Sequence, residues 1–240
     1  MKLTGFLAGA VVLAFALCSC GRDDGKLVMV TEATFPPYEF REGNRITGID
    51  VDLMEAVAKA AGKELVVEDM SFDSVIAAVQ AGKADVAASG ITVTDERKRQ
   101  VNFSIPYMTA QQVIIVPKGS PIRGKADLKG KRVGVQHGTT GDLFMAKNIQ
   151  EPERFPNGAL AVAALDADKL DAVVLDIEPS KVHVSMRKNL VILDEPLTSE
   201  EYAIAIRKDN TALLEQVNAV IRQLRGNGGL DAIKAKYTKK

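Results

Sequence analysis

Residues 64–88, ELVVEDMSFDSVIAAVQAGKADVAA, carry the strongest fold signal in the chain. Within them, residues 64–68 predict a strand, and residues 71–81 predict a short helix that Gly82 ends. Residues 85–88 return as another strand after a short turn. Two strands that flank a helix with short connections indicate a parallel βαβ unit with a right-handed crossover.

The residues before this stretch extend the same pattern. Residues 27–30, LVMV, predict a buried strand, and residues 50–61 place apolar side chains at helical spacing up to Gly62. Asp50 or Asp52, at the start of this helix, is the expected cap. The region therefore reads β-α-β-α-β, which predicts a mainly parallel sheet.

The pattern returns in the second half of the chain. Residues 131–140, KRVGVQHGTT, echo residues 26–35, KLVMVTEATF. Residues 167–174, ADKLDAVV, echo residues 81–88, AGKADVAA. These echoes predict two similar α/β lobes rather than one large sheet.

Further elements join and close the lobes. Residues 210–225 and 230–237 predict two helices at the end of the chain. Residues 111–116 and 202–206 are extended and apolar, and either segment could carry the chain between the lobes. No low-complexity linker separates the two halves.

The composition excludes several classes of protein. The 240 residues include 31 Lys+Arg and 31 Asp+Glu, so no net charge attracts the chain to nucleic acid. Cys18 and Cys20 are the only cysteines, and His137 and His183 are the only histidines, which is too few for a zinc-finger or iron–sulfur site. We therefore expect no metal and no cofactor, and we expect His183 on the surface of a helix at residues 177–188.

Residues 1–19 predict a lipoprotein signal peptide. Lys2 precedes an apolar run at residues 6–17 that is short for a membrane span. Residues 17–21, LCSCG, resemble a bacterial lipobox, in which the last cysteine is lipidated and becomes the mature N-terminus. We expect an exported protein, in the periplasm or at the cell surface, that Cys20 anchors to the membrane. A standard signal peptide cut elsewhere is the alternative.

Residues suited to a zwitterionic ligand follow the predicted strands. In an α/β lobe, ligands collect beyond the carboxyl ends of the strands. Residues 89–97, SGITVTDER, lie there, and Arg97 can form a bidentate pair with a carboxylate, although it could instead pair with Asp95 at a helix start. Asp176 follows the matching strand of the second half and could accept hydrogen bonds from an ammonium group. Arg97 facing Asp176 would define an α-amino acid.

Four segments have counterparts in one protein family. They are TEATFPPYEF at 31–40, GIDVDL at 48–53, GITVTDER at 90–97 and VQHGTT at 135–140. In this order and spacing they resemble the family 3 solute-binding proteins of ABC amino-acid importers, and the resemblance covers residues 26–240. It implies a two-lobed, type II periplasmic-binding-protein fold, in which each lobe is a mainly parallel sheet flanked by helices and two hinge strands join the lobes. Lobe 1 would comprise residues 26–108 and 204–240, and lobe 2, with the hinge segments, residues 109–203.

The resemblance also implies how the α-amino and α-carboxylate groups are held. Gly90 and Thr92 match positions that hold the carboxylate beside the arginine matched by Arg97. Thr140 matches a position in the second lobe that completes this cradle with backbone and hydroxyl donors. Asp176 matches the acceptor of the ammonium group.

Five further residues match positions around the ligand side chain. Phe35 and Phe72 match two aromatic walls, although from the residues alone both could simply be core. Ser89 matches another polar contact, and Glu32 and Gln136 match positions that read the far end of the side chain.

The identity of the amino acid is argued from these groups. Glu32 favours a cationic partner, whereas the two aromatic walls and a neutral Gln136 could also enclose the flat amide of glutamine. Leu175 departs from relatives that have histidine or glutamine there. We rank arginine or another basic amino acid first and glutamine next.

The resemblance implies a function without catalysis. A monomer would close its lobes over one L-amino acid and deliver it to the permease subunits of an ABC importer. Two alternatives remain: an exported enzyme similar to cyclohexadienyl or arogenate dehydratases, with Glu32 or His137 in acid–base chemistry, and a ligand-sensing domain that acts through a separate partner.

Overall fold

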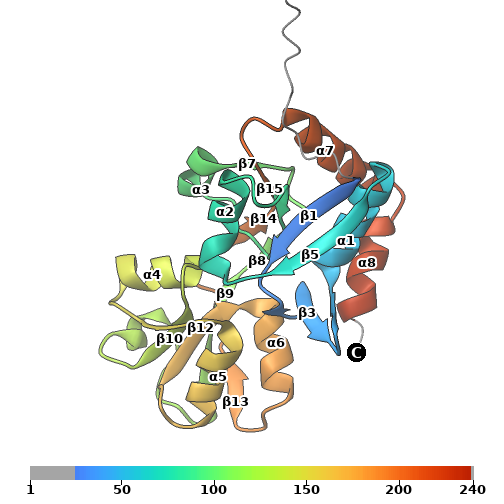
Figure 1. Cartoon of the computed structure of the whole chain (residues 1–240). Helices are drawn as coiled ribbons and strands as arrows, with labels where there is room; N and C mark the ends of the chain where they lie inside the picture. The colour runs from blue at the N-terminus through green and yellow to red at the C-terminus, as the bar shows by residue number, and fades with distance from the viewer. Residues whose placement is uncertain (1–24, 239–240) are drawn as a thin grey trace, which may run out of the picture.

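The computed structural model describes residues 25–238, which form two α/β lobes drawn one above the other in Figure 1. Each lobe is built on a five-stranded sheet. The two-lobed α/β fold predicted from the sequence is therefore confirmed. The predicted signal peptide at residues 1–19 and the lipidation site at Cys20 lie outside the described residues.

The sheet of the first lobe has the strand order β5-β1-β6-β15-β7. β5, β1 and β6 are parallel, and β15 runs antiparallel to both of its neighbours, so four of the five strands share one direction. The strands are β1 (Lys26–Thr31), β5 (Glu64–Asp69), β6 (Val86–Ala87), β7 (Asn102–Phe103) and β15 (Ala205–Ile206). The helices of this lobe are α1 (Ile49–Ala60), α2 (Phe72–Gln80), α3 (Asp95–Gln100), α7 (Thr211–Gly226) and α8 (Gly229–Thr238).

The sheet of the second lobe repeats this arrangement with the order β11-β10-β12-β9-β13. Here β9 is the strand that runs against the other four. The strands are β9 (Gln112–Pro117), β10 (Val133–Gln136), β11 (Glu153–Phe155), β12 (Ala172–Asp176) and β13 (Leu190–Ile192). The helices are α4 (Thr140–Asn148), α5 (Gly158–Asp166), α6 (Ile177–Ser185) and the 3-10 helix η1 (Lys125–Leu128).

Both faces of each sheet are buried, which explains why the strands read as continuous apolar runs. In β1, Leu27 and Met29 pack with residues of α1 and α7, whereas Val28 and Val30 pack with residues of α2 on the other face. β12 alternates in the same way between α5 and α4. Helices thus cover each sheet on two sides, as Figure 1 shows for the upper lobe.

Two short antiparallel strands connect the lobes: β8 (Met108–Ala110) and β14 (Glu200–Tyr202). β8 lies just before the segment 111–116, and β14 ends at the start of the segment 202–206. From the sequence, these two segments were the candidate connections between the lobes. Those segments instead supply β9 and β15, the strands of opposite direction in the two sheets. The lobe boundaries at residues 108/109 and 203/204 stay predictions.

A three-stranded hairpin sheet lies beside the start of α1. Its strands are β2 (Thr34–Phe35), β3 (Glu39–Glu42) and β4 (Arg45–Thr47). The prediction that Asp50 or Asp52 caps α1 is wrong, because Gly48 is the N-cap residue and no side chain caps the helix. Gly48 has φ 138°, and a Cβ there would lie 2.1 Å from the carbonyl oxygen of Tyr38, so only glycine fits.

The prediction of a surface position for His183 is also wrong. His183 is only 6% exposed, because the face of α6 that carries it packs against the second sheet. Burial, with Arg187 nearby, lowers the pKa of His183 to about 4, so it is neutral at pH 7.

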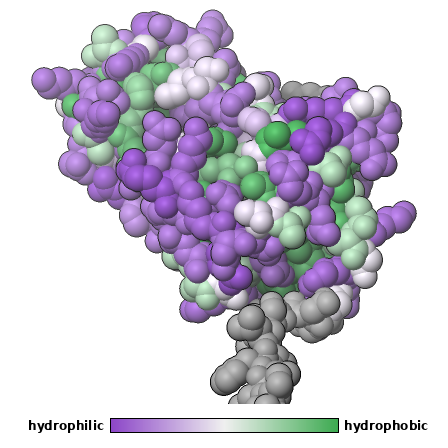
Figure 2. Space-filling view, turned by 90° about the horizontal axis from the view of Figure 1, so that it is seen from above, coloured by the Kyte–Doolittle hydropathy of each residue, from purple (hydrophilic) through white to green (hydrophobic). Residues whose placement is uncertain are grey.

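The outer surface is polar. Hydrophilic side chains cover most of the face seen in Figure 2, and hydrophobic ones show only between them. Within residues 25–238, no helix is both long and apolar enough to cross a membrane.

Candidate ligand-binding site

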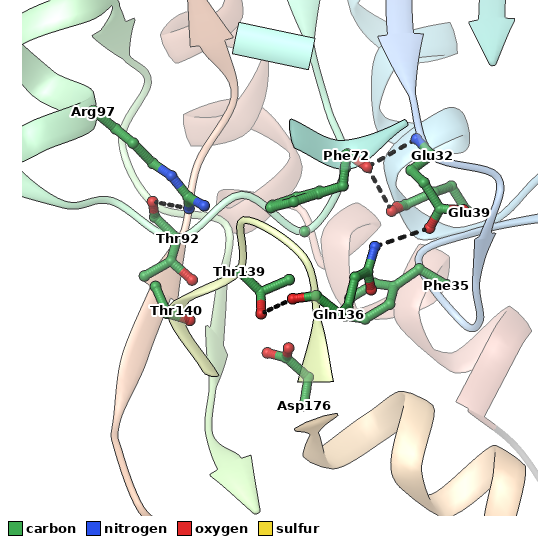
Figure 3. A pocket seen from close by; sticks show the side chains of 12 residues that line it. Glu32, Phe35, Glu39, Phe72, Thr92, Arg97, Gln136, Thr139, Thr140 and Asp176 are labelled. Carbon is green, nitrogen blue, oxygen red and sulfur yellow. Dashed lines mark hydrogen bonds between the residues drawn. The ribbon is translucent and has the colours of Figure 1, made fainter. Parts of the chain in front are cut away.

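A pocket lies between the lobes, and its wall contains every ligand-binding residue predicted from the sequence (Figure 3). Two residues that the sequence analysis did not select, Glu39 and Thr139, also line it. The ten predicted residues in the wall are Glu32, Phe35, Phe72, Ser89, Gly90, Thr92, Arg97, Gln136, Thr140 and Asp176.

The strand ends bring these residues together. Glu32 follows β1 and Ser89 follows β6, whereas Gln136 and Asp176 end β10 and β12. The carboxyl ends of the central parallel strands of both lobes therefore face the same space, as expected for ligand sites in α/β folds. In Figure 3, Arg97 lies at one end of the cavity and Glu32 at the other, with the ring of Phe72 between them.

Arg97 is a buried cation without an ion pair in the described part of the chain. It is 8% exposed, and Nη1 donates to the carbonyl of Thr92 at 2.9 Å. Nη2 donates to the carbonyl of Gly138 in the other lobe at 3.1 Å. Asp95, the alternative partner, instead lies 3.7 Å from Lys98. Burial lowers the pKa of Arg97, and the nearby carboxylates of Glu200 and Asp176 offset part of this effect.

The hydroxyls of Thr92 and Thr140 do not serve as donors to a ligand carboxylate. Thr92 Oγ1 donates to Glu200 Oε2 at 2.6 Å, and Thr140 Oγ1 donates to the same oxygen at 2.8 Å. A hydroxyl has a single proton, so neither can also donate to a ligand carboxylate. The backbone N–H of Thr140, at the first position of α4, remains a suitable donor.

Gly90 supplies space rather than a donor. Its N–H donates to Asp50 Oδ2 at 2.9 Å and is therefore not available to a ligand. A Cβ at Gly90, where φ is 52°, would lie 2.9 Å from the ring of Phe35. Glycine thus lets the backbone approach the aromatic wall.

Asp176 is a buried acid held by neutral donors. Tyr202 donates its hydroxyl to Oδ1, and Gln112 Nε2 donates to Oδ2 at 2.9 Å. Burial raises the pKa of Asp176 to about 7. A cation beside Asp176 would favour the ionised form.

The opposite end of the cavity is acidic. Glu32 is 6% exposed, accepts from Thr34 Oγ1 at 2.6 Å and from Gln136 Nε2 at 3.4 Å, and has no cationic partner among residues 25–238. Burial raises its pKa. Gln136 Oε1 is a buried acceptor without a hydrogen-bond donor. A donor group of a ligand would satisfy both residues.

Glu39 is more deeply buried than Glu32. Burial and then the neighbouring Asp50 raise the pKa of Glu39 well above its usual range. Its Oε1 accepts from Ser89 Oγ at 3.0 Å, and its Oε2 has no hydrogen-bond partner.

The aromatic walls combine two roles. Phe35 is 7% exposed and stacks on Tyr38 at 5.7 Å between ring centroids, so it is core as well as wall. Phe72 is half-buried, and the guanidinium carbon of Arg97 lies 5.3 Å from its ring centroid. The ring thereby fixes the arginine.

Other candidates lie outside the cavity. His137 is exposed at its rim, where Nδ1 lies 3.8 Å from Asp73 Oδ2 of the other lobe. Leu175 is 2% exposed and packs against Gly158, so it belongs to the core. Across the described residues no cluster of His, Cys, Asp or Glu is arranged to hold a metal.

Several supporting residues had no clear signal in the sequence. Glu39 lies inside the motif at 31–40 and pairs with Phe35 across the β2–β3 hairpin, so this motif could have suggested it. Gln112 lies in β9, and Glu200 and Tyr202 lie in β14. Their hydrogen-bond partners, Asp176 and Thr92, are distant from them in the sequence.

Comparisons with known proteins agree with this geometry. The chain is 35% identical to the arginine-binding extracellular protein of Bacillus subtilis, over 99% of this chain and 98% of that protein. It is 45% identical to an arginine-bound, truncated ArgBP from T. maritima, with a TM-score of 0.80 and coverage of 83% and 96%. It is 39% identical to an ancestral arginine-binding protein bound to glutamine, with a TM-score of 0.83 and coverage of 90% and 99%.

The family comparison also decides between binding and catalysis. The alternative of a dehydratase-like enzyme is overturned, because the matching family and these relatives are solute-binding proteins. Over residues 27–240 the chain matches the bacterial extracellular solute-binding proteins, family 3, and it belongs to that family.

Proposed function

We propose that this protein binds a basic L-amino acid, arginine first, as the extracytoplasmic receptor of an ABC importer. The observation that carries the proposal is a set of buried charges around one cavity. Arg97, Asp176 and Glu32 face it, each is less than 9% exposed, and none has an ion pair among residues 25–238. A ligand that supplies the missing counter-ions would be strongly favoured.

The order of these charges matches a basic amino acid. The α-carboxylate pairs with Arg97 and the N–H at the start of α4, and the α-ammonium group pairs with Asp176. The cationic side chain then reaches Glu32 and the free acceptor of Gln136, between the faces of Phe35 and Phe72. With Asp176 and Glu32 ionised, the three protein charges sum to −1, which a ligand of charge +1 neutralises.

Glutamine is the second candidate, because an ancestral arginine-binding protein of similar structure holds it. Its amide would offer two N–H donors to Glu32 and Gln136 without a positive charge. It would leave the buried carboxylate of Glu32 uncompensated. The relatives named as arginine-binding support the first rank of arginine.

Lobe closure accompanies binding. Side-chain contacts already cross between the lobes, among them Arg97 to the carbonyl of Gly138, Gln136 to Glu32, and His137 to Asp73. A ligand held by groups of both lobes adds contacts that exist only in the closed form and so shifts the population toward it. The closed monomer, anchored through lipidated Cys20, would then dock on the permease subunits.

A thermal-shift screen of the lipid-free protein from Gly21 onward tests the proposal, after refolding to remove carried ligand. An amino acid at about 100 times its Kd adds about 2.7 kcal/mol, which raises the melting temperature by about 5 to 10 °C. We expect the largest shift from arginine, and no shift from agmatine, which lacks the carboxylate. No shift from any amino acid would contradict the proposal.

A further inference from the structure

Glu200 joins the hinge to both lobes. It begins β14, one of the two strands that connect the lobes, and pairs with Ala110 of β8. Its Oε2 accepts from Thr92 of the first lobe and Thr140 of the second. Thr198 Oγ1 donates to Oε1 at 2.7 Å and fixes the remaining oxygen. Glu200 itself is not part of the cavity wall.

These bonds determine what the two hydroxyls present to a ligand. Each threonine gives its only proton to Glu200, so its remaining lone pairs can only accept. Thr140 Oγ1 already accepts from Gln112 Nε2 at 3.2 Å, whereas Thr92 Oγ1 has no other side-chain hydrogen bond among the described residues. A hydroxyl that accepts suits an ammonium group and not a carboxylate.

We propose that Glu200 is a positioning residue for ligand recognition: it holds Thr92 and Thr140 as acceptors for the α-ammonium group and ties their orientation to the hinge. The inference rests on the proposed function, since it needs an α-amino acid in the cavity. It assigns Thr92 to the ammonium beside Asp176, whereas the family resemblance implied a contact with the carboxylate.

The arrangement also depends on closure. Thr92 and Thr140 belong to different lobes, so one oxygen of Glu200 can bind both only while the lobes are together. The ligand and the hinge thereby stabilise the same closed state.

The test compares two ligands that differ only in the α-amino group. Titration calorimetry measures the Kd of arginine and of 5-guanidinopentanoic acid, its des-amino analogue. Where a ligand binds weakly, its Kd is obtained by displacement with a tighter ligand. We expect Glu200→Ala to raise the Kd of arginine by about tenfold or more, which is the range for a hydrogen bond to a charged group, and to raise the Kd of the analogue much less. Glu200→Gln keeps an acceptor oxygen and should restore part of the lost affinity.

The matched control is Glu201→Ala. Glu201 is exposed on the same strand, and its side chain makes no hydrogen bond within residues 25–238, so this variant should bind like the wild type. Melting curves of the ligand-free variants report whether each folds. Equal loss for both ligands, or no loss in Glu200→Ala, would overturn the inference and leave the proposed function standing. Wild-type protein that binds no amino acid would instead contradict the proposed function.

Discussion

Replacing Arg97 with alanine should weaken amino-acid binding without weakening the fold. The guanidinium is 8% exposed, lies over Phe72, and donates to carbonyls of both lobes, at Thr92 and Gly138. No described carboxylate forms an ion pair with it, so its charge is available to a ligand carboxylate. Burial lowers its pKa, which means that the ligand-free site disfavours the charge.

The magnitude follows from what the variant leaves behind. Without Arg97, the ligand carboxylate enters a closed cavity with only backbone and neutral donors. Truncation of one partner of a buried, hydrogen-bonded charge pair costs about 2 to 5 kcal/mol, which corresponds to a Kd about 30-fold to 5,000-fold higher. Arg97→Lys keeps the charge but loses the two-pronged geometry, so we expect an intermediate loss.

Titration calorimetry with arginine at pH 7.5 measures the effect, and Arg99→Ala is the control. Arg99 lies exposed on the same helix, α3, so this variant makes the same change of charge outside the cavity. The ligand-free Arg97→Ala protein should melt at the same or a higher temperature, because an uncompensated buried charge is removed. Unchanged arginine affinity in Arg97→Ala would refute the reasoning.

Three further predictions test other parts of the account. In calorimetry, Glu32→Gln should weaken arginine binding by about tenfold or more and should not weaken glutamine binding, because it removes only a charge that glutamine leaves uncompensated; an equal loss for both would contradict this role. Burial raises the pKa of Asp176 to about 7, and an ammonium ligand favours its ionised form, so binding releases a proton. Arginine affinity should therefore rise with pH up to about 7, by at most about tenfold per unit, and Asp176→Asn should reduce that slope; an unchanged slope would exclude Asp176 as its source. Gly48→Ala should lower the melting temperature by about 5 to 10 °C, because its Cβ would lie 2.1 Å from a backbone oxygen. Gly43→Ala, with a positive φ of 61° but open space, should cost less, and equal losses would show that the close contact is unimportant.

The architecture could be predicted because each local pattern has one consistent solution. β1 alternates Leu27 and Met29 with Val28 and Val30, all apolar, and only a sheet covered on both faces buries them all. The strands that connect the lobes lie a few residues before the segments predicted for them, because no local sequence feature distinguishes a strand that joins two lobes from one that enters a sheet.

The site could be predicted in its membership and only partly in its contacts. Parallel strands gather their carboxyl ends, so Arg97 and Asp176 were expected to face one space, whereas Glu32 was expected only from the family resemblance. The direction of a hydroxyl proton depends instead on tertiary partners: Thr92 and Thr140 donate to Glu200, 108 and 60 positions away along the chain. No periodicity or motif carries that information.

The comparison of arginine with citrulline tests the central claim most directly, because citrulline keeps the α-amino acid and the chain length but replaces the guanidinium with a neutral urea. If Glu32 recognises the positive charge of the side chain, the protein should bind arginine at least about 100-fold more tightly than citrulline. In the citrulline complex, the urea oxygen would face the acceptor oxygens of Glu32 and Gln136, and the carboxylate of Glu32 would stay uncompensated. Both Kd values are measured by calorimetry on refolded wild-type protein. Citrulline affinity equal to that of arginine would contradict the account.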